Sequence, residues 1–111
     1  MDAKISEINK QFDALTNEMD TIYTKQSNLT KTKDTITSLL QQNRKLLNEL
    51  NETWRTGRMH AHIQDVEMKF KHDQQTIFHE FEKETYLIKK EKNQLEEKES
   101  ILFSKRRKLM K

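Results

Sequence analysis

The sequence predicts an all-α fold, an antiparallel two-helix coiled-coil hairpin. Three observations predict it. The 111 residues include no proline and one glycine, so helix breakers are almost absent. Only 32% of the residues are hydrophobic, whereas a layered globular domain has roughly 45–50%. The apolar residues nevertheless recur at steps of three and four, which is typical of a coiled coil and not of a disordered chain.

An unbroken heptad pattern predicts a first helix over about residues 2–54. Apolar side chains fill most of the a and d positions, which face the partner helix in a coiled coil; we call this stripe the seam. Its polar members favour one register or partner at a cost in stability. The a positions are Ile5, Phe12, Met19, Gln26, Lys33, Leu40, Leu47 and Trp54, and the d positions are Ile8, Leu15, Ile22, Leu29, Ile36, Asn43 and Leu50.

A less regular pattern predicts a second helix over about residues 59–110. Its seam starts in one register and then shifts by four residues, a stutter that locally unwinds a supercoil. Beyond the stutter each heptad has one apolar seam residue and one charged companion, so this helix would pair poorly with a copy of itself. The seam residues are Met59, Ile63, Val66, Phe70 and Ile77, then Phe81, Ile88, Leu95, Leu102 and Leu109, with Glu84, Glu91, Lys98 and Lys105 as companions.

The two halves have nearly equal lengths, so each is the simplest partner for the other. Antiparallel pairing of residues whose numbers sum to about 113 or 114 sets Leu47 against Val66 and Phe12 against Leu102, and most seam residues then meet apolar partners. At about 1.5 Å per residue, each arm would be about 80 Å long. We expect one elongated domain over residues 1–111, a monomeric hairpin.

The turn is expected at about residues 55–58. Gly57 falls where a seam residue is due, and glycine adopts left-handed backbone conformations freely. Trp54 and Met59 would close the seam beneath the turn. The alternative is one continuous helix in a homodimeric coiled coil, because a single glycine costs a helix only about 1 kcal/mol.

No pattern of catalytic residues is present. The chain has no cysteine, no glycine-rich phosphate loop and no nucleophile with a matching base. His60 and His62 are two residues apart and His72 and His79 seven apart, so neither pair has the i,i+4 spacing of a helical zinc site. We expect no enzyme activity, no metal or other cofactor and no small-molecule substrate.

The N-terminal segment and the cysteine content indicate a cellular compartment. The N-terminal "MDAKISEINK" lacks the apolar segment of a signal peptide, and no apolar run approaches the roughly 20 residues of a membrane span. Absence of cysteine fits a reducing environment. We therefore expect a cytoplasmic protein without a membrane span.

Apolar residues outside the seam predict contact surfaces for other proteins. The basic C-terminal end carries five positive charges, which exceed the net charge of +3, so the rest of the chain sums to −2. Nucleic-acid binding is not expected, because a broad basic face and aromatic stacking platforms are absent. The apolar residues are Tyr23, Leu39, Leu46, Phe78, Tyr86, Leu87, Ile101, Phe103 and Met110; the basic ones are Lys105, Arg106, Arg107, Lys108 and Lys111.

In architecture the whole chain resembles the stalk proteins of the bacterial flagellar and type III secretion export apparatus; the nearest segments are the seam "ISEINKQF" and the basic end "FSKRRKLMK". The resemblance implies a non-enzymatic rod that sits in the hexameric export ATPase, reaches toward the export gate and also handles secretion chaperones. By that analogy the ATPase end comprises Ile5, Ile8, Phe12, Phe103, Arg106 and Arg107. The tip and middle, facing the gate, comprise Trp54, Arg55, Arg58, Phe78 and Leu87.

Two other functions fit the same features. A small helical secretion chaperone or holdase would also expose apolar residues, although a prefoldin-like subunit would need strands, and no alternating strand pattern is present. A structural coiled-coil dimerisation spacer is the other alternative.

Overall fold

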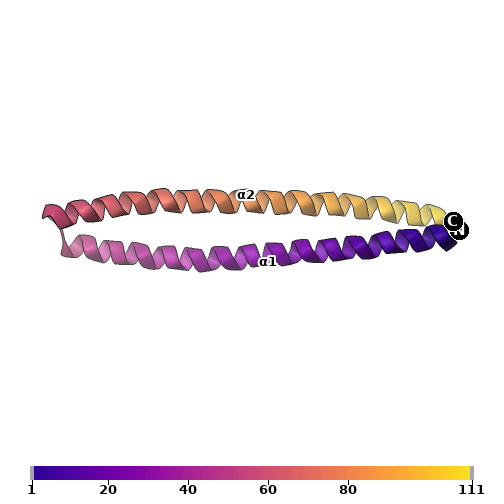
Figure 1. The fold of residues 1–111 in the computed structure, drawn as a ribbon, viewed down its shortest axis with the longest axis horizontal. Coiled ribbons are helices and arrows are strands. Elements are labelled where there is room, and N and C mark those ends of the chain that lie inside the picture. Colours follow the sequence, from indigo (N-terminus) through magenta and orange to yellow (C-terminus); the bar gives the residue numbers. More distant parts are fainter. Residues whose placement is uncertain (1, 111) are drawn as a thin grey trace. The chain divides into compact units, whose positions relative to one another are not determined.

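The computed structural model describes residues 2–110 and consists of two helices joined by a short loop (Figure 1). Helix α1 spans Asp2–Thr53 and helix α2 spans Gly57–Met110. No strand occurs among the described residues. The all-α helical hairpin predicted from the heptad pattern is therefore confirmed.

The contacts divide the chain into two compact units. Unit 1 contains the described residues up to Asn28 and those from Glu84 onward, and unit 2 is Leu29–Lys83. In each unit a segment of α1 lies antiparallel to a segment of α2, and in unit 1 the start of α1 lies beside the end of α2 (Figure 1).

The core of unit 1 is a ladder of aliphatic side chains from the predicted seam. Each of them keeps less than a tenth of its surface exposed, and fully burying such a side chain contributes about 1.5–3 kcal/mol. The α1 members are spaced seven apart, as are the α2 members, so each heptad adds one layer. These residues are Ile8, Leu15 and Ile22 of α1 and Ile88, Leu95 and Leu102 of α2.

Unit 2 has a thinner core. Its buried side chains are Leu47, Ile63 and Phe81, and six further seam residues are half-buried. Within residues 2–110 no polar or charged residue is classed as buried. The half-buried seam residues are Leu29, Ile36, Leu40, Leu50, Phe70 and Ile77.

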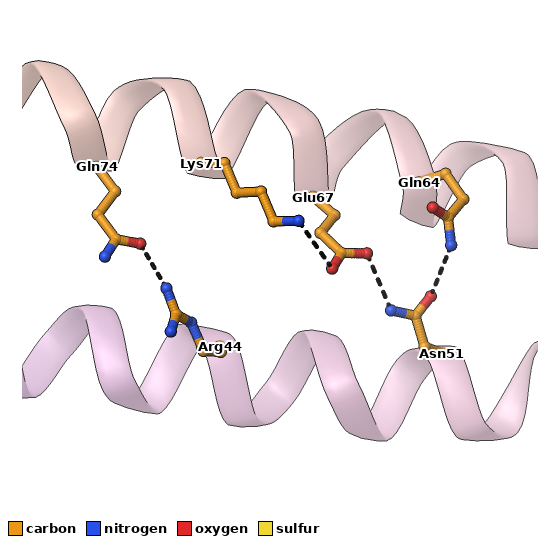
Figure 2. Close-up of polar contacts among 6 residues, drawn as sticks. All are labelled: Arg44, Asn51, Gln64, Glu67, Lys71 and Gln74. Atoms are coloured by element: carbon orange, nitrogen blue, oxygen red, sulfur yellow. Dashed lines mark hydrogen bonds and ion pairs between the residues drawn. The ribbon is translucent and has the colours of Figure 1, made fainter.

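Polar contacts replace part of the predicted apolar seam near the loop. Asn51 Nδ2 donates to Glu67 Oε2 at 3.2 Å, and Gln64 Nε2 donates to Asn51 Oδ1 at 3.5 Å (Figure 2). The Lys71 ammonium lies 4.0 Å from the Glu67 carboxylate on the same helix. Glu67, and not Val66, therefore contacts α1 at this level.

Three apolar residues of the predicted seam were placed wrongly. Val66 is 54% exposed, Met59 is 47% exposed and Trp54 is 45% exposed. The half-buried Glu67, next to Val66, turns inward to meet Asn51, and Val66 faces solvent as a result. Farther from the loop, Arg44 Nη2 donates to Gln74 Oε1 at 2.9 Å, another polar link between the helices (Figure 2).

The charged companions of the second seam were also predicted on the wrong side. Glu84, Glu91, Lys98 and Lys105 are all exposed. The half-buried charged residues lie four positions after Ile88, Leu95 and Leu102, not three. They are Lys92, Glu99 and Arg106.

Aromatic rings of α1 account for two of these inward positions. Lys92 Nζ lies 5.3 Å from the centre of the Tyr23 ring, and Arg106 lies over Phe12. The long aliphatic stems of lysine and arginine cover apolar surface while the cationic group meets the ring face. The seven-residue spacing of the apolar residues identifies one row of the α2 seam. It does not show whether the second row lies three or four residues after the first.

The pairing along unit 1 is offset from the predicted one. Leu102 was expected opposite Phe12, whereas it lines a groove together with Leu15, and the Phe12 ring contacts Phe103 instead. The single apolar line of α2 thus meets the d residues of α1, which are the more deeply buried ones.

The loop comprises residues 54–56, slightly before the turn predicted at 55–58. Trp54 N donates to Leu50 O at 2.8 Å, so the helical bonding of α1 continues one residue beyond its end. Gly57 has a φ of +85° and is the first residue of α2, not the middle of the turn. The reversal of chain direction between α1 and α2 therefore ends at Gly57. In the part of the chain that the structure describes, neither helix is long and apolar enough to cross a membrane.

Candidate protein-interaction surfaces

Side-chain clusters that could hold a metal ion are missing from residues 2–110, because nowhere do three or more His, Cys, Asp or Glu side chains converge. Of the four histidines, His60 is half-buried and the others are exposed. The hollows are grooves along the helices, lined by residues such as Lys, Glu, Leu and Gln. The candidate sites are these grooves and the exposed side chains beside them.

The first surface lies in unit 1, where the start of α1 meets the end of α2. The Phe12 and Phe103 rings pack with centroids 4.9 Å apart at an interplanar angle of 54°. The guanidinium carbon of Arg106 lies 4.7 Å from the Phe12 centroid and 5.3 Å from the Phe103 centroid. A planar cation over ring faces is attracted by their quadrupoles. We call Phe12, Phe103 and Arg106 the aromatic–arginine cluster.

The residues predicted for the ATPase end have different accessibilities. Ile8 is buried between the helices, so it shapes this end without presenting a surface. Ile5, Phe12 and Arg106 are half-buried. Phe103 is 41% exposed and Arg107 is exposed.

Phe103 and Arg107 line a groove of about 590 Å³ that is formed by residues of α2 alone; we call it the outer groove. It contains two carboxylates as well as two guanidinium groups, so it suits a partner with charges of both signs. Lys111 of the basic end lies outside the described residues. The outer groove is lined by Glu96, Glu99, Ser100, Phe103, Arg106, Arg107 and Met110.

The second surface is the tip of unit 2. The exposed side chains of Trp54, Arg55 and Arg58 project from the loop and the first turn of α2. His60 Nδ1 lies 3.0 Å from Trp54 O, and Arg55 Nε donates to Glu52 O at 3.3 Å. These bonds occupy carbonyl groups that the end of α1 would otherwise leave unpaired. The tip thus combines an indole ring with two guanidinium groups on an ordered turn.

The two predicted middle residues belong to different units. Phe78 is half-buried in unit 2, while Leu87 belongs to unit 1 and is 49% exposed. Unit 2 also exposes Leu39 and Leu46, which are seven residues apart and so share one side of α1. Met68, 71% exposed, had no place in the sequence prediction, because one methionine off the seam gives no periodic signal.

The third surface, in unit 1, was not predicted. A groove of about 310 Å³ runs between α1 and α2, and an adjoining groove of about 320 Å³ shares Glu18 and Lys98 with it. We call them together the inter-helix groove. Sequence reasoning missed it because both helices line it; the off-seam Ile101 was its only signal. Its residues are Gln11, Ala14, Leu15, Glu18, Thr21, Ile22, Lys25, Glu91, Gln94, Leu95, Lys98, Ile101, Leu102 and Lys105.

Comparison with known families gives one result. The sequence pattern of DUF3958, described as a protein of unknown function, matches residues 3–109, almost the whole chain. The chain belongs to the DUF3958 family. Neither the comparison with curated proteins nor that with solved structures found a significant match.

The DUF3958 match covers both helices and the loop between them. The aromatic–arginine cluster, the tip and the inter-helix groove therefore all lie within the family region. The three surfaces are features of this DUF3958 hairpin itself.

Proposed function

We propose that this DUF3958 protein is a non-enzymatic coiled-coil adaptor that binds other proteins through side chains outside its seam. One observation carries the proposal: the hairpin leaves large apolar side chains exposed on both helices, beyond those that its core uses. Such residues, grouped on a surface, mark contact sites for proteins. They are Tyr23, Leu39, Leu46, Met59, Val66, Met68, Tyr86, Leu87, Ile101, Phe103 and Met110.

The specific role that we propose is that of a stalk in a bacterial type III secretion export apparatus. In it the protein binds the hexameric export ATPase in the cytoplasm and links it to the export gate. The resemblance of the chain to such stalks supports this role, as does the exposure of Phe103 and Arg107 beside the ordered Arg106. The tip, with Trp54 and its two arginines, is the proposed contact with the gate.

An ATPase assay tests the stalk role. The purified protein is added to the export ATPase of the same host, and we expect ATP hydrolysis to rise several-fold. Phe103→Ala and Arg107→Ala should reduce the stimulation at least about tenfold, as expected for central contact residues. Lys90→Ala is the matched control, because Lys90 is exposed on α2 outside the outer groove. Absence of both binding and stimulation would remove the stalk role.

A second candidate is a small helical secretion chaperone. The exposed Leu39, Leu46 and Met68 of unit 2 favour it, since a holdase needs apolar surface away from its own core. Suppression of the aggregation of a secreted substrate, lost in a Leu39→Asp/Leu46→Asp variant, would support this function. Full suppression by that variant would contradict it.

A further inference from the structure

The inter-helix groove of unit 1 has an apolar floor and charged edges. Leu15 and Leu102 lie at its base, and the exposed Ile101 borders it. Ala14 and Thr21, on the α1 side, have short side chains that let another helix approach closely. A groove of this kind accommodates an amphipathic helix.

The face of α2 beside this groove has an ordered sequence of side chains. Gln94, Lys98, Ile101 and Lys105 line the groove, preceded by Glu91. Leu87 lies seven residues before Gln94, and Glu84 seven residues before Glu91, so both continue the same face. In order along α2, this face reads Glu84, Leu87, Glu91, Gln94, Lys98, Ile101, Lys105.

This order is complementary to its own reverse. When a second α2 lies antiparallel across the face, Glu84 meets Lys105 and Glu91 meets Lys98. Leu87 then meets Ile101, and Gln94 meets Gln94. Every carboxylate faces an ammonium group and every apolar residue faces another. A parallel arrangement in the same register would instead place like charges together.

We propose that the inter-helix groove binds a second copy of this chain, with the two α2 helices antiparallel about a two-fold axis near Gln94. A two-fold interface requires a self-complementary patch, in which residue i contacts j and j contacts i. The symmetric arrangement forms four ion pairs around two apolar contacts. The seam heptads alone predict a monomer, because they are satisfied within one chain; this face lies outside the seam.

The residues needed for the dimer are accessible. Lys98 and Lys105 have no ion-pair partner among residues 2–110, and Ile101 is 55% exposed. Glu91 lies 4.0 Å from Lys25 of the same hairpin, with both side chains about half exposed, so its carboxylate still has an accessible side. The outer groove shares no residue with this face, whereas Leu87 and Ile101 are among the exposed apolar residues on which the proposed adaptor function rests. The dimer is tested with the purified chain alone, so its failure and the failure of the export-ATPase role are distinguishable.

Charge exchange at Glu84 and Lys105 tests the dimer, with mass measured by light scattering. Wild-type protein is expected at twice the 13.4 kDa of one chain. E84K alone and K105E alone should each raise the dissociation constant roughly tenfold, because each variant turns two ion pairs into repulsive contacts. An equimolar mixture of the two should dimerise like the wild type, since every contact across the heterodimer is again a pair of opposite charges.

A cysteine placed on the axis gives an independent readout. The chain has no cysteine, so Gln94→Cys introduces a single thiol that meets its own copy at the axis. Mild oxidation should yield a disulfide-linked dimer, whereas Ser100→Cys, in the outer groove, should not. Helicity measured by circular dichroism should equal that of the wild type in all variants. A chain that stays monomeric at about 100 μM, equal cross-linking of the two cysteines, or no recovery on mixing would each overturn the proposal.

Discussion

Gly57 begins α2 with a φ of +85°, which side chains with a β-carbon rarely adopt. Nothing lies within 4 Å of the place where a β-carbon would stand. Steric crowding therefore does not require a glycine at position 57, whereas the backbone conformation there does. The reversal between the helices depends on this one residue.

The first prediction concerns that residue. Gly57→Ala should lower the free energy of unfolding by about 1–2 kcal/mol, the cost of a left-handed conformation for an L residue. Gly57→Asn should lose less, because asparagine tolerates this region better. Urea unfolding followed by circular dichroism measures both variants. Thr56→Ala is the control; a Gly57→Ala protein as stable as the control would contradict the assigned turn.

Arg106 is the second residue with a distinct role. Its guanidinium lies over two rings, one on each helix, so it links α1 and α2 of unit 1. Arg106→Ala should cost about 1–2 kcal/mol, given roughly 0.5–1 kcal/mol for each partly exposed cation–π contact. Arg107→Ala should stay within about 0.5 kcal/mol, as an exposed neighbour without a ring contact does. Equal losses in thermal unfolding would show that Arg106 does not act through the rings.

Some residue positions followed from the sequence and others did not. Ile8, Leu15 and Ile22 were placed in the core by heptad spacing alone, and the structure confirms them. Val66 obeyed the same spacing and is exposed, because its neighbour Glu67 turns toward α1 and bonds to Asn51. A heptad count does not weigh polar bonds across helices. The aromatic–arginine cluster likewise needed the cross-helix register, which spacing within one helix does not supply.

At the scale of the elements, the two helices were predicted almost to their ends. The absence of proline and the unbroken seam were sufficient for α1. The second row of seam residues in α2 could not be predicted in the same way, because its members are as polar as the alternative set. The members are Lys92, Glu99 and Arg106, and the alternative set is Glu91, Lys98 and Lys105. Only the rings of Tyr23 and Phe12 on the neighbouring helix distinguish the two sides.

Packing of α1 against α2 gives the third prediction. Leu15→Ala should destabilise unit 1 by about 2 kcal/mol or more, since it removes buried methyl groups from between the helices. Leu39→Ala should change stability by less than about 0.5 kcal/mol, because Leu39 is 53% exposed. Chemical unfolding of both variants measures the difference. If Leu39→Ala is as damaging as Leu15→Ala, Leu39 belongs to a core and not to a partner surface.

At the scale of the whole molecule, the residues that hold the helices together and those proposed to bind partners are largely separate. Ile88, Leu95 and Ile63 are buried, while Phe103 and Leu87 keep two fifths or more of their surface exposed. Substitutions at exposed positions should therefore change binding without unfolding the chain. The coiled-coil hairpin was predictable from the sequence, whereas the partners are not, because exposed apolar residues show where a protein binds and not which protein it is.

The central claim is that α1 and α2 pack antiparallel within a single chain. Cysteines replacing Tyr23 and Lys92, which contact each other across unit 1, provide the most direct test. A short bismaleimide reagent is applied to an equal mixture of ¹⁵N-labelled and unlabelled protein, and the linked peptides are identified by mass spectrometry. The pair Tyr23→Cys and Glu97→Cys is the control, because Glu97 is exposed two residues beyond the buried Leu95. We predict abundant links between positions 23 and 92 that join peptides of one isotope. Links between position 92 of one hairpin and position 92 of a second hairpin are a separate product and are not counted. Links between positions 23 and 92 that are mainly of mixed isotope, or none beyond the control, would contradict the hairpin and favour a continuous helix in a homodimer.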